Sequence, residues 1–315
     1  MLALRTILCC LSIFLVSCGE SPSQPTSTQS DPNTARDEIR IAAMSPAMSV
    51  MIRDLGYEDR IVAKHDYDMI LGSRVPAAGS ELGFDLEMLI QTNPTHVLFQ
   101  KTSTERSQRF LQIAQEHHWI IFERPLNTLD DIATTMDDLY FLFNGVPQRQ
   151  DRQYDMNEVF SQPLPSAKLA AAWDDLGPVA DAAGRVLVLG SVDPIGAMGP
   201  GSYHHQIIDR LGASQAITEG SMWIELDYED LIRLNPDSIV LIAPRQPSED
   251  ERFAEPSEPT PDDIKRIFGP IMELPINAVT NGHIGVVDHP LGLLPSGSLG
   301  KVAEEIAALF QQWDQ

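Results

Sequence analysis

The sequence predicts an α/β fold of two Rossmann-like lobes, each a mostly parallel sheet flanked by helices, joined by a long linker helix. Short β-rich runs alternate with amphipathic segments in two separate stretches of the chain, and this alternation is typical of parallel sheets covered on both faces. A sixteen-residue unit occurs in both stretches, as FDLEMLIQTNPTHVLF (84–99) and LDYEDLIRLNPDSIVL (226–241). A mostly helical stretch, residues 128–183, separates them.

The first seventeen residues have the features of a bacterial export signal. Arg5 is the basic start, and TILCCLSIFLVS (6–17) is an apolar run shorter than the roughly 20 residues of a membrane span. The run leads into Cys18 in a pattern that matches the bacterial lipobox, so we expect Cys18 to carry a lipid. Residues 18–37, rich in Ser, Thr, Pro and Gln, are then a disordered tether. The alternative is a plain signal peptide with a chance cysteine.

The composition limits the partners of the chain. It has 45 acidic and 22 basic residues, a formal net charge of −23, which disfavours nucleic acid and anionic membrane surfaces. We therefore expect the lipid on Cys18, rather than the protein surface, to attach the protein to a membrane. The other two cysteines lie in the predicted signal, so the folded part has no thiol for a disulfide or a cysteine metal site.

The amino-terminal lobe is expected over residues 38–127. Its strands are predicted at 39–43, 60–63, 97–99 and 119–122, and its helices at 47–55, between Asp85 and Asn93, and at 104–117. Asp85 is a good N-cap, and Asn93 with the proline after it ends the helix that carries the repeat. Residues 64–83 are predicted to be a loop.

Helices connect the halves over residues 128–183. Thr128 and Asp131 have the spacing of a capping box, and five apolar residues at helical spacing form a buried stripe: Leu129, Ile132, Met136, Leu139 and Phe143. Helix is also predicted at 148–160 and 166–176. Pro163 and Pro165 interrupt it, and a proline inside a helix costs roughly 3 kcal/mol, so we expect a break or kink there.

The carboxy-terminal lobe, residues 184–315, repeats the α/β pattern. Strands are predicted at 185–189, 238–242 and 284–287, helices at 203–211, in the second copy of the repeat and at 299–312, a glycine-rich turn at 196–201 and an exposed loop at 245–262. Ligands of such sheets bind beyond the carboxyl ends of the strands. Two lobes that face each other with those ends form a cleft.

Four segments in order resemble the helical-backbone (class III) periplasmic substrate-binding proteins of ABC importers, in the branch for vitamin B12, ferric siderophores and haem: SPAMSVMIRDLGYEDRIVA, RVPAAGSELGFDLEMLIQTNPTHVLF, GPGSYHHQIIDRLGASQAI and WIELDYEDLIRLNPDSIVLI. NAVTNGHIGVVD resembles the closing strand, and the resemblance runs from about residue 39 to 312. It implies a stiff linker helix and small closure, although the two prolines depart from that pattern.

The resemblance also implies a function. The protein would be a monomeric lipoprotein of the cell envelope, facing the periplasm or the cell exterior. It would capture a metal chelate (cobalamin or another corrinoid, ferric siderophore or haem) between its lobes. It would deliver the chelate to an ABC importer, a permease dimer with its ATPase subunits.

Glu87 and Glu229 occupy the same place in the two copies of the repeat. The resemblance implies that these glutamates dock on arginines of the two transporter subunits. A carboxylate in the first turn of a helix is also stabilised by the helix dipole, by roughly 0.3–1 kcal/mol. That effect, together with a common ancestor of the lobes, would explain the matched positions without docking.

The candidate ligand-binding residues are expected around the cleft: Ser45, Met48, His65, Tyr67, Lys101, Tyr203, His204 and Trp223. A tyrosine or histidine at the start of a helix could ligate haem iron. Trp223 could stack on a corrin, porphyrin or aromatic siderophore ring, and Met48 could form part of an apolar wall. The alternatives are ordinary polar residues of a helix end or loop for the histidines and tyrosines, and a core or inter-lobe position for Trp223.

The spacing of the histidines and the number of cations limit the kinds of ligand that are expected. The eight histidines are scattered, without the i, i+4 spacing of a zinc helix, so no direct metal site is predicted. Few cations, namely Lys64, Arg74 and Lys101, are expected at the cleft of the first lobe, which favours a bulky neutral or weakly charged ligand such as a corrinoid.

No catalytic residue is predicted, because the chain lacks a Gly-x-Ser-x-Gly elbow, a P-loop ending and a cysteine nucleophile. The alternatives to a transport protein are a surface haem-binding or adhesion lipoprotein without a dedicated transporter, and a secreted α/β hydrolase-like enzyme.

Overall fold

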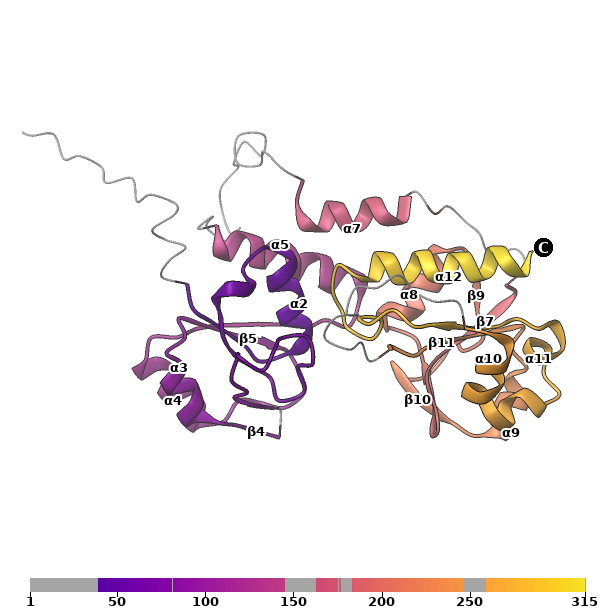
Figure 1. Ribbon diagram of the computed structural model, residues 1–315, viewed down its shortest axis with the longest axis horizontal. Helices are drawn as coiled ribbons and strands as arrows, with labels where there is room; N and C mark the ends of the chain where they lie inside the picture. The colour runs from indigo at the N-terminus through magenta and orange to yellow at the C-terminus, as the bar shows by residue number, and fades with distance from the viewer. Residues whose placement is uncertain are drawn as a thin grey trace, which may run out of the picture.

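The computed structural model describes residues 39–80, 82–144, 163–174, 176, 183–245 and 259–314, which form two lobes under a layer of helices (Figure 1). The predicted export signal, Cys18, the tether, the helix at 148–160 and most of the loop at 245–262 lie outside these residues. Within the described ranges, no helix has the length and apolar character needed to cross a bilayer.

The amino-terminal lobe is built on a four-stranded parallel sheet in the order β2-β1-β5-β6. Its strands are β1 (Ile41–Ala43), β2 (Ile61–Lys64), β5 (His96–Gln100) and β6 (Ile120–Arg124), and a small hairpin consists of β3 (Gly79–Ser80) and β4 (Gly83–Phe84). The helices are α2 (Pro46–Asp54), α3 (Leu86–Thr92) and α4 (Gln108–Glu116). Every predicted helix and strand is present and the parallel sheet is confirmed, but the predicted loop 64–83 also contains β3 and the first residue of β4.

The carboxy-terminal lobe has a mixed sheet in the order β10-β8-β7-β11-β12, with β9 also paired to β7. Its strands are β7 (Arg185–Val192), β8 (Ile195–Met198), β9 (Ser214–Gln215), β10 (Trp223–Leu226), β11 (Ser238–Ile242) and β12 (Ile284–Val287). Its helices are α8 (Tyr203–Arg210), α9 (Tyr228–Leu234), α10 (Pro261–Phe268), α11 (Asn277–Asn281) and α12 (Leu299–Trp313).

One prediction for this lobe was wrong. The expected glycine-rich turn at 196–201 begins as strand β8, which pairs antiparallel with β7 and with β10. Gly196 and Gly199 suggested a turn, but both leave space for side chains from β10, since a Cβ on Gly196 would lie 2.0 Å from Trp223 and one on Gly199 2.9 Å from Ile224.

Two packed helices make up the described part of the linker. In α5 (Leu129–Phe143) the Thr128–Asp131 capping box is formed and the predicted apolar stripe is buried. The second helix, α7 (Pro165–Asp174), begins at one of the two interrupting prolines. It is tied to α5 by hydrogen bonds from the backbone N–H and hydroxyl of Ser166 to Asp137, at 2.9 and 2.6 Å. The expected interruption is therefore present, and the linker is not one continuous helix.

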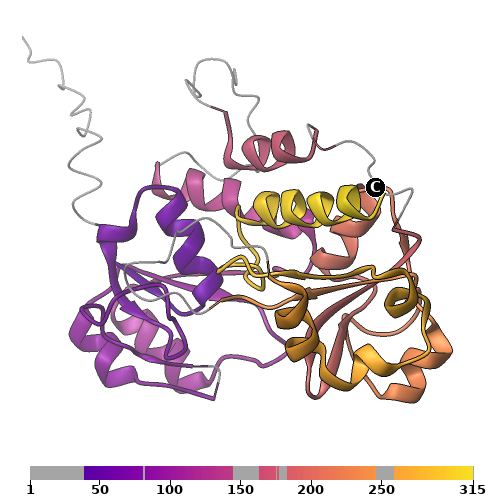
Figure 2. The same cartoon turned by 45° about the vertical axis from the view of Figure 1, so that its right-hand side comes forward.

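One apolar cluster runs beneath this helix layer into both lobes, and each lobe has a further cluster of its own. The buried members of the shared core include Ile41 of β1, Leu139 of α5, Trp173 of α7, Ile207 of α8 and Phe310 of α12. Figures 1 and 2 show α5, α7 and α12 together on one side of the molecule. The two lobes are therefore joined by packing as well as by the chain.

Candidate ligand-binding cleft

Two adjoining cavities lie between the lobes, at the carboxyl ends of the strands. The strand-end cavity, about 300 Å³, is lined from the first lobe by residues at or just after the ends of β1, β5 and β6 and from the second by β8, β10 and the start of α8. The loop cavity, about 530 Å³, lies between residues 67–73 and the loops after β11 and β12. Both are lined by Pro46, Leu293 and Leu294, so they form neighbouring parts of one cleft.

Trp223 forms an aromatic wall of the strand-end cavity. Its side chain packs over two glycines of the sheet, because a Cβ on Gly190 would lie 2.8 Å, and one on Gly196 2.0 Å, from the indole ring. Trp223 is nevertheless 45% exposed. A ring that is supported by the sheet on one side and open on the other is suited to stacking against a planar ligand.

Tyr203 and His204 join the start of α8 to the loop after β12. The Tyr203 hydroxyl donates to the Leu293 carbonyl and His204 Nε2 donates to the Gly292 carbonyl, both at 2.7 Å. His204 is 1% exposed, and burial lowers its pKa to about 4 although the Gly292 hydrogen bond acts the other way. The imidazole is therefore neutral at neutral pH and holds the cavity wall with Nε2, so this nitrogen is not open to a metal.

The loop cavity is bordered by a tightly hydrogen-bonded loop, residues 64–72. The Lys64 ammonium donates to the carbonyls of Asp68, Leu71 and Gly72 at 3.0, 2.7 and 3.5 Å. His65 is buried and its Nδ1 accepts from the backbone N–H of Tyr67 at 3.1 Å. Tyr67 itself is exposed and lines the cavity.

The structure brings most of the candidate ligand residues to the cleft. Ser45, Tyr203, His204 and Trp223 line the strand-end cavity and Tyr67 lines the loop cavity. His65 is buried in the loop, and Lys101 is exposed but lines neither cavity. Met48 was expected in the apolar wall of the cleft, but it is fully buried in the shared core. The reason is that α2 starts at Pro46 and turns this position inward.

Two cleft cations were missed by the sequence interpretation. Arg53, in the last turn of α2, and Arg245, after β11, both line the loop cavity. Each lies near an acidic residue, with Arg53 3.6 Å from Asp54 and Arg245 3.6 Å from Asp288. Arg245 follows the end of a buried strand closely, a position that could have indicated a cleft residue.

The two copies of the repeat form equivalent helices, α3 and α9. Asp85 and Asp227 cap them by accepting from backbone N–H groups at 2.9 and 2.8 Å. Glu87 and Glu229 are exposed in the first turns. In Figures 1 and 2, α3 and α9 lie in different lobes, both on the side away from α7 and α12. The two glutamates are therefore exposed in equivalent helices of different lobes.

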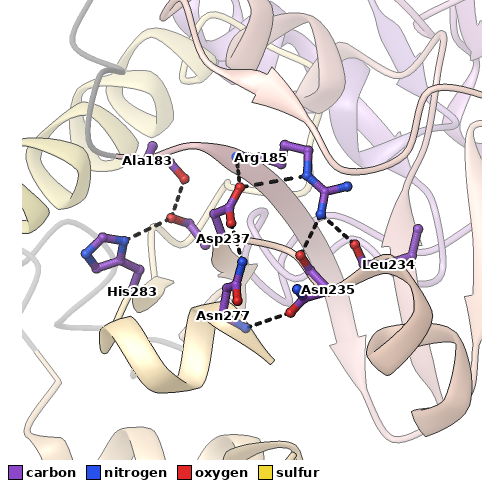
Figure 3. A network of polar contacts seen from close by, with 8 residues as sticks. Ala183, Arg185, Leu234, Asn235, Asp237, Asn277 and His283 are labelled. Atoms are coloured by element: carbon purple, nitrogen blue, oxygen red, sulfur yellow. Dashed lines mark hydrogen bonds and ion pairs between the residues drawn. The ribbon is translucent and has the colours of Figure 1, made fainter. Parts of the chain in front are cut away.

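An arginine holds the end of each of these helices. Arg40, just before β1, donates to the carbonyls of Thr92 and Asn93 at 2.6 and 2.9 Å. Arg185, the first residue of β7, donates to the carbonyls of Leu234 and Asn235 at 2.8 and 2.6 Å (Figure 3). We name these contacts the arginine clamps; they extend the repeat well beyond sixteen residues.

The clamp of the second lobe has additional support. The backbone N–H of Arg185 donates to Asp237 at 2.9 Å, and the Asn277 amide donates to the other oxygen of Asp237 at 2.7 Å. These hydrogen bonds lower the pKa of Asp237, the Arg185 N–H contributing most. The carboxylate is therefore ionised at neutral pH and holds the start of β7 next to α11.

No protein-family model and no curated protein matches the chain. Solved structures do resemble it. The periplasmic heme-binding protein RhuT from Roseiflexus sp. RS-1 has a TM-score of 0.61 at 19% identity, over 88% of this chain and 100% of the other. The heme-binding protein HutB of Vibrio cholerae has 0.61 at 18%, over 86% and 98%. The vitamin B12-binding protein BtuF of Vibrio cholerae has 0.57 at 14%, over 88% and 98%.

The chain therefore has the two-lobed fold of the class III periplasmic binding proteins, as its sequence motifs predicted. In the part of the chain that the structure describes, no three His, Cys, Asp or Glu side chains gather closely enough to hold a metal ion.

Proposed function

We propose that this protein is an extracytoplasmic solute-binding lipoprotein that captures a metal chelate between its lobes and delivers it to an ABC importer. The observation that supports this most directly is the pair of adjoining cavities at the strand ends. Pockets of roughly 300–1,000 Å³ are typical of bound cofactors and similar ligands. The fold is shared with proteins described as binding heme or vitamin B12.

The proposed ligand set combines a flat ring with polar groups from both lobes. Trp223 stacks against the ring of the chelate, an interaction of about 0.5–1.5 kcal/mol beyond the burial of area. Ser45 and Tyr67 approach from the first lobe, and Arg53 and Arg245 from the two sides of the loop cavity. Tyr203 and His204 hold the wall in place. The chelate is a corrinoid, a ferric siderophore or a haem.

Delivery would use the two exposed glutamates. Glu87 and Glu229 lie on equivalent helices of different lobes, which matches a permease made of two like subunits. A carboxylate paired with an arginine forms directional, charge-assisted hydrogen bonds. We propose that the mature chain is a monomer attached to the membrane by the Cys18 lipid, through the tether of residues 18–37.

A ligand screen tests the capture step. The chain without its signal and lipid, residues 19–315, would be mixed with cyanocobalamin, haemin and ferrichrome and analysed by native mass spectrometry and absorption spectroscopy. A one-to-one complex with one of the three is expected. If none of them forms a complex or raises the melting temperature, the proposed function is wrong.

Charge reversal tests the delivery step. Glu87→Lys and Glu229→Lys together should abolish ligand uptake by cells while the affinity of the purified protein stays unchanged. Glu116→Lys and Glu273→Lys, at exposed positions of the same two lobes, are controls with the same change in net charge. A loss of ligand affinity in the double variant, or equal loss of uptake in the controls, would refute the docking role.

A further inference from the structure

One buried carboxylate in the cleft is only half satisfied. Asp68 is 2% exposed and lines the loop cavity. Its Oδ1 accepts from the backbone N–H groups of Ile70 and Leu71, at 2.9 and 3.0 Å. Its Oδ2 is buried and has no hydrogen-bond partner among the described residues. A buried acceptor without a donor is unfavourable, so this oxygen requires a donor that the described residues do not supply.

The nearest cation of the loop does not fill this role. The Lys64 ammonium has three protons, and its three hydrogen bonds go to the backbone carbonyls of Asp68, Leu71 and Gly72. It therefore fixes the course of the loop around Asp68 and leaves the side-chain oxygen Oδ2 to another donor.

The two arginines that line the loop cavity each lie near an acidic residue. Arg53 lies 3.6 Å from Asp54, and Arg245 lies 3.6 Å from Asp288. Asp54 and Asp288 do not line the cavity, and Asp68 is the acidic side chain among its described lining residues. An anionic ligand group placed against this part of the loop would therefore meet the carboxylate of Asp68.

We propose that Asp68 is a specificity-determining residue that accepts a hydrogen bond from an N–H or O–H group of the ligand. This inference rests on the proposed function and narrows its ligand class. The bound chelate presents amide or hydroxyl groups, rather than carboxylates, to the first lobe. Among the three probes, cyanocobalamin carries peripheral amides, ferrichrome carries peptide N–H groups, and haemin carries two carboxylates.

Two substitutions separate this role from a role in the loop alone. In Asp68→Asn, Oδ1 can still accept from Ile70 and Leu71, but an NH₂ donor replaces Oδ2. Asp68→Ala removes both oxygens. Asp66→Asn is the matched control, because Asp66 lies in the same loop, is exposed, and uses Oδ1 to accept from the Gly79 N–H at 2.9 Å.

Dissociation constants for cyanocobalamin, ferrichrome and haemin would be measured by calorimetry on residues 19–315, with circular dichroism to confirm folding. The wild type should bind an amide-bearing probe more tightly than haemin. Asp68→Asn and Asp68→Ala should weaken that binding about tenfold, as expected for one lost hydrogen bond to a charged group, while Asp66→Asn leaves it unchanged. Asp68→Asn should also reduce the preference over haemin.

Three results would overturn the inference. The first is wild-type affinity in a folded Asp68→Asn variant. The second is a preference of the wild type for haemin over both other probes. The third is an equal loss in Asp66→Asn. Binding of none of the probes by the wild type would overturn the proposed function as well, which distinguishes the two failures.

Discussion

Replacement of Arg185 by alanine should loosen the end of α9 selectively. The substitution removes the hydrogen bonds from the guanidinium to the carbonyls of Leu234 and Asn235 (Figure 3). It leaves the bond from the backbone N–H of residue 185 to Asp237 in place. The lost contacts are therefore those of the clamp and the exposed ion pair with Asp237, and the pairing of β7 is kept.

The size of the effect follows from the geometry. Hydrogen bonds to charged groups contribute about 1.5–3 kcal/mol when shielded. Both bonds here share one nitrogen, and the Arg185 side chain is 46% exposed. The ion pair with Asp237, at 3.7 Å, adds little because exposed pairs contribute about 0–1 kcal/mol. We expect a loss of about 1–2 kcal/mol in the free energy of local opening of α9.

Amide hydrogen exchange measures this opening directly. The amides of residues 231–235 should exchange about 5- to 30-fold faster in Arg185→Ala, while those of β11 and β12 keep their protection. Arg40→Ala is the matched variant and should have the same effect on α3, through the carbonyls of Thr92 and Asn93. Unchanged exchange in α9, or a uniform rise across the whole lobe, would contradict the clamp.

Three further changes test other parts of the structure. Gly196→Ala places a Cβ 2.0 Å from the Trp223 ring, so the ring must move away to an ordinary contact distance. The near-ultraviolet circular dichroism should then change, and the affinity for the screened ligand should fall about tenfold. An unchanged affinity would exclude stacking on Trp223. Burial and the charge of Asp288 raise the pKa of Glu305 from 4.5 to about 7, so the stability that the protonated group contributes at low pH is lost as pH rises through 7. The melting temperature of Glu305→Gln relative to wild type should therefore increase between pH 5 and 8. A difference that stays constant over this range would refute the role of Glu305. Burial lowers the pKa of His204 from 6.5 to about 4, so the wild type should lose stability as pH falls through this range. His204→Gln, which can still donate to the Gly292 carbonyl, should lose less. If the melting temperatures of the two proteins fall equally with pH, His204 is not responsible.

Local signals in the sequence were sufficient for much of the fold. The bounds of β11 and β12 match their predicted ranges, since each is a short, mostly apolar run that is buried along its whole length. The caps at Asp85 and Thr128 also form as predicted, because a cap depends on residues only three positions apart.

Contacts between distant residues were less predictable. The Trp223 ring occupies space that Gly190 and Gly196 leave free, and no local pattern contains that relation. The arginine clamps join residues about fifty positions apart. Arg53 reaches the cleft because the loops of the other lobe close over the end of α2, so its role depends on tertiary structure.

The apolar core shared by both lobes has a consequence for how the molecule folds. A lobe expressed alone would expose to water the surface that now packs beneath α5, α7 and α12, and burial of such surface is the main driving force of folding. The two halves should therefore unfold in one cooperative transition. For the same reason, a recombinant exchange of one half with that of a related protein would require the helices above the core to be exchanged with it.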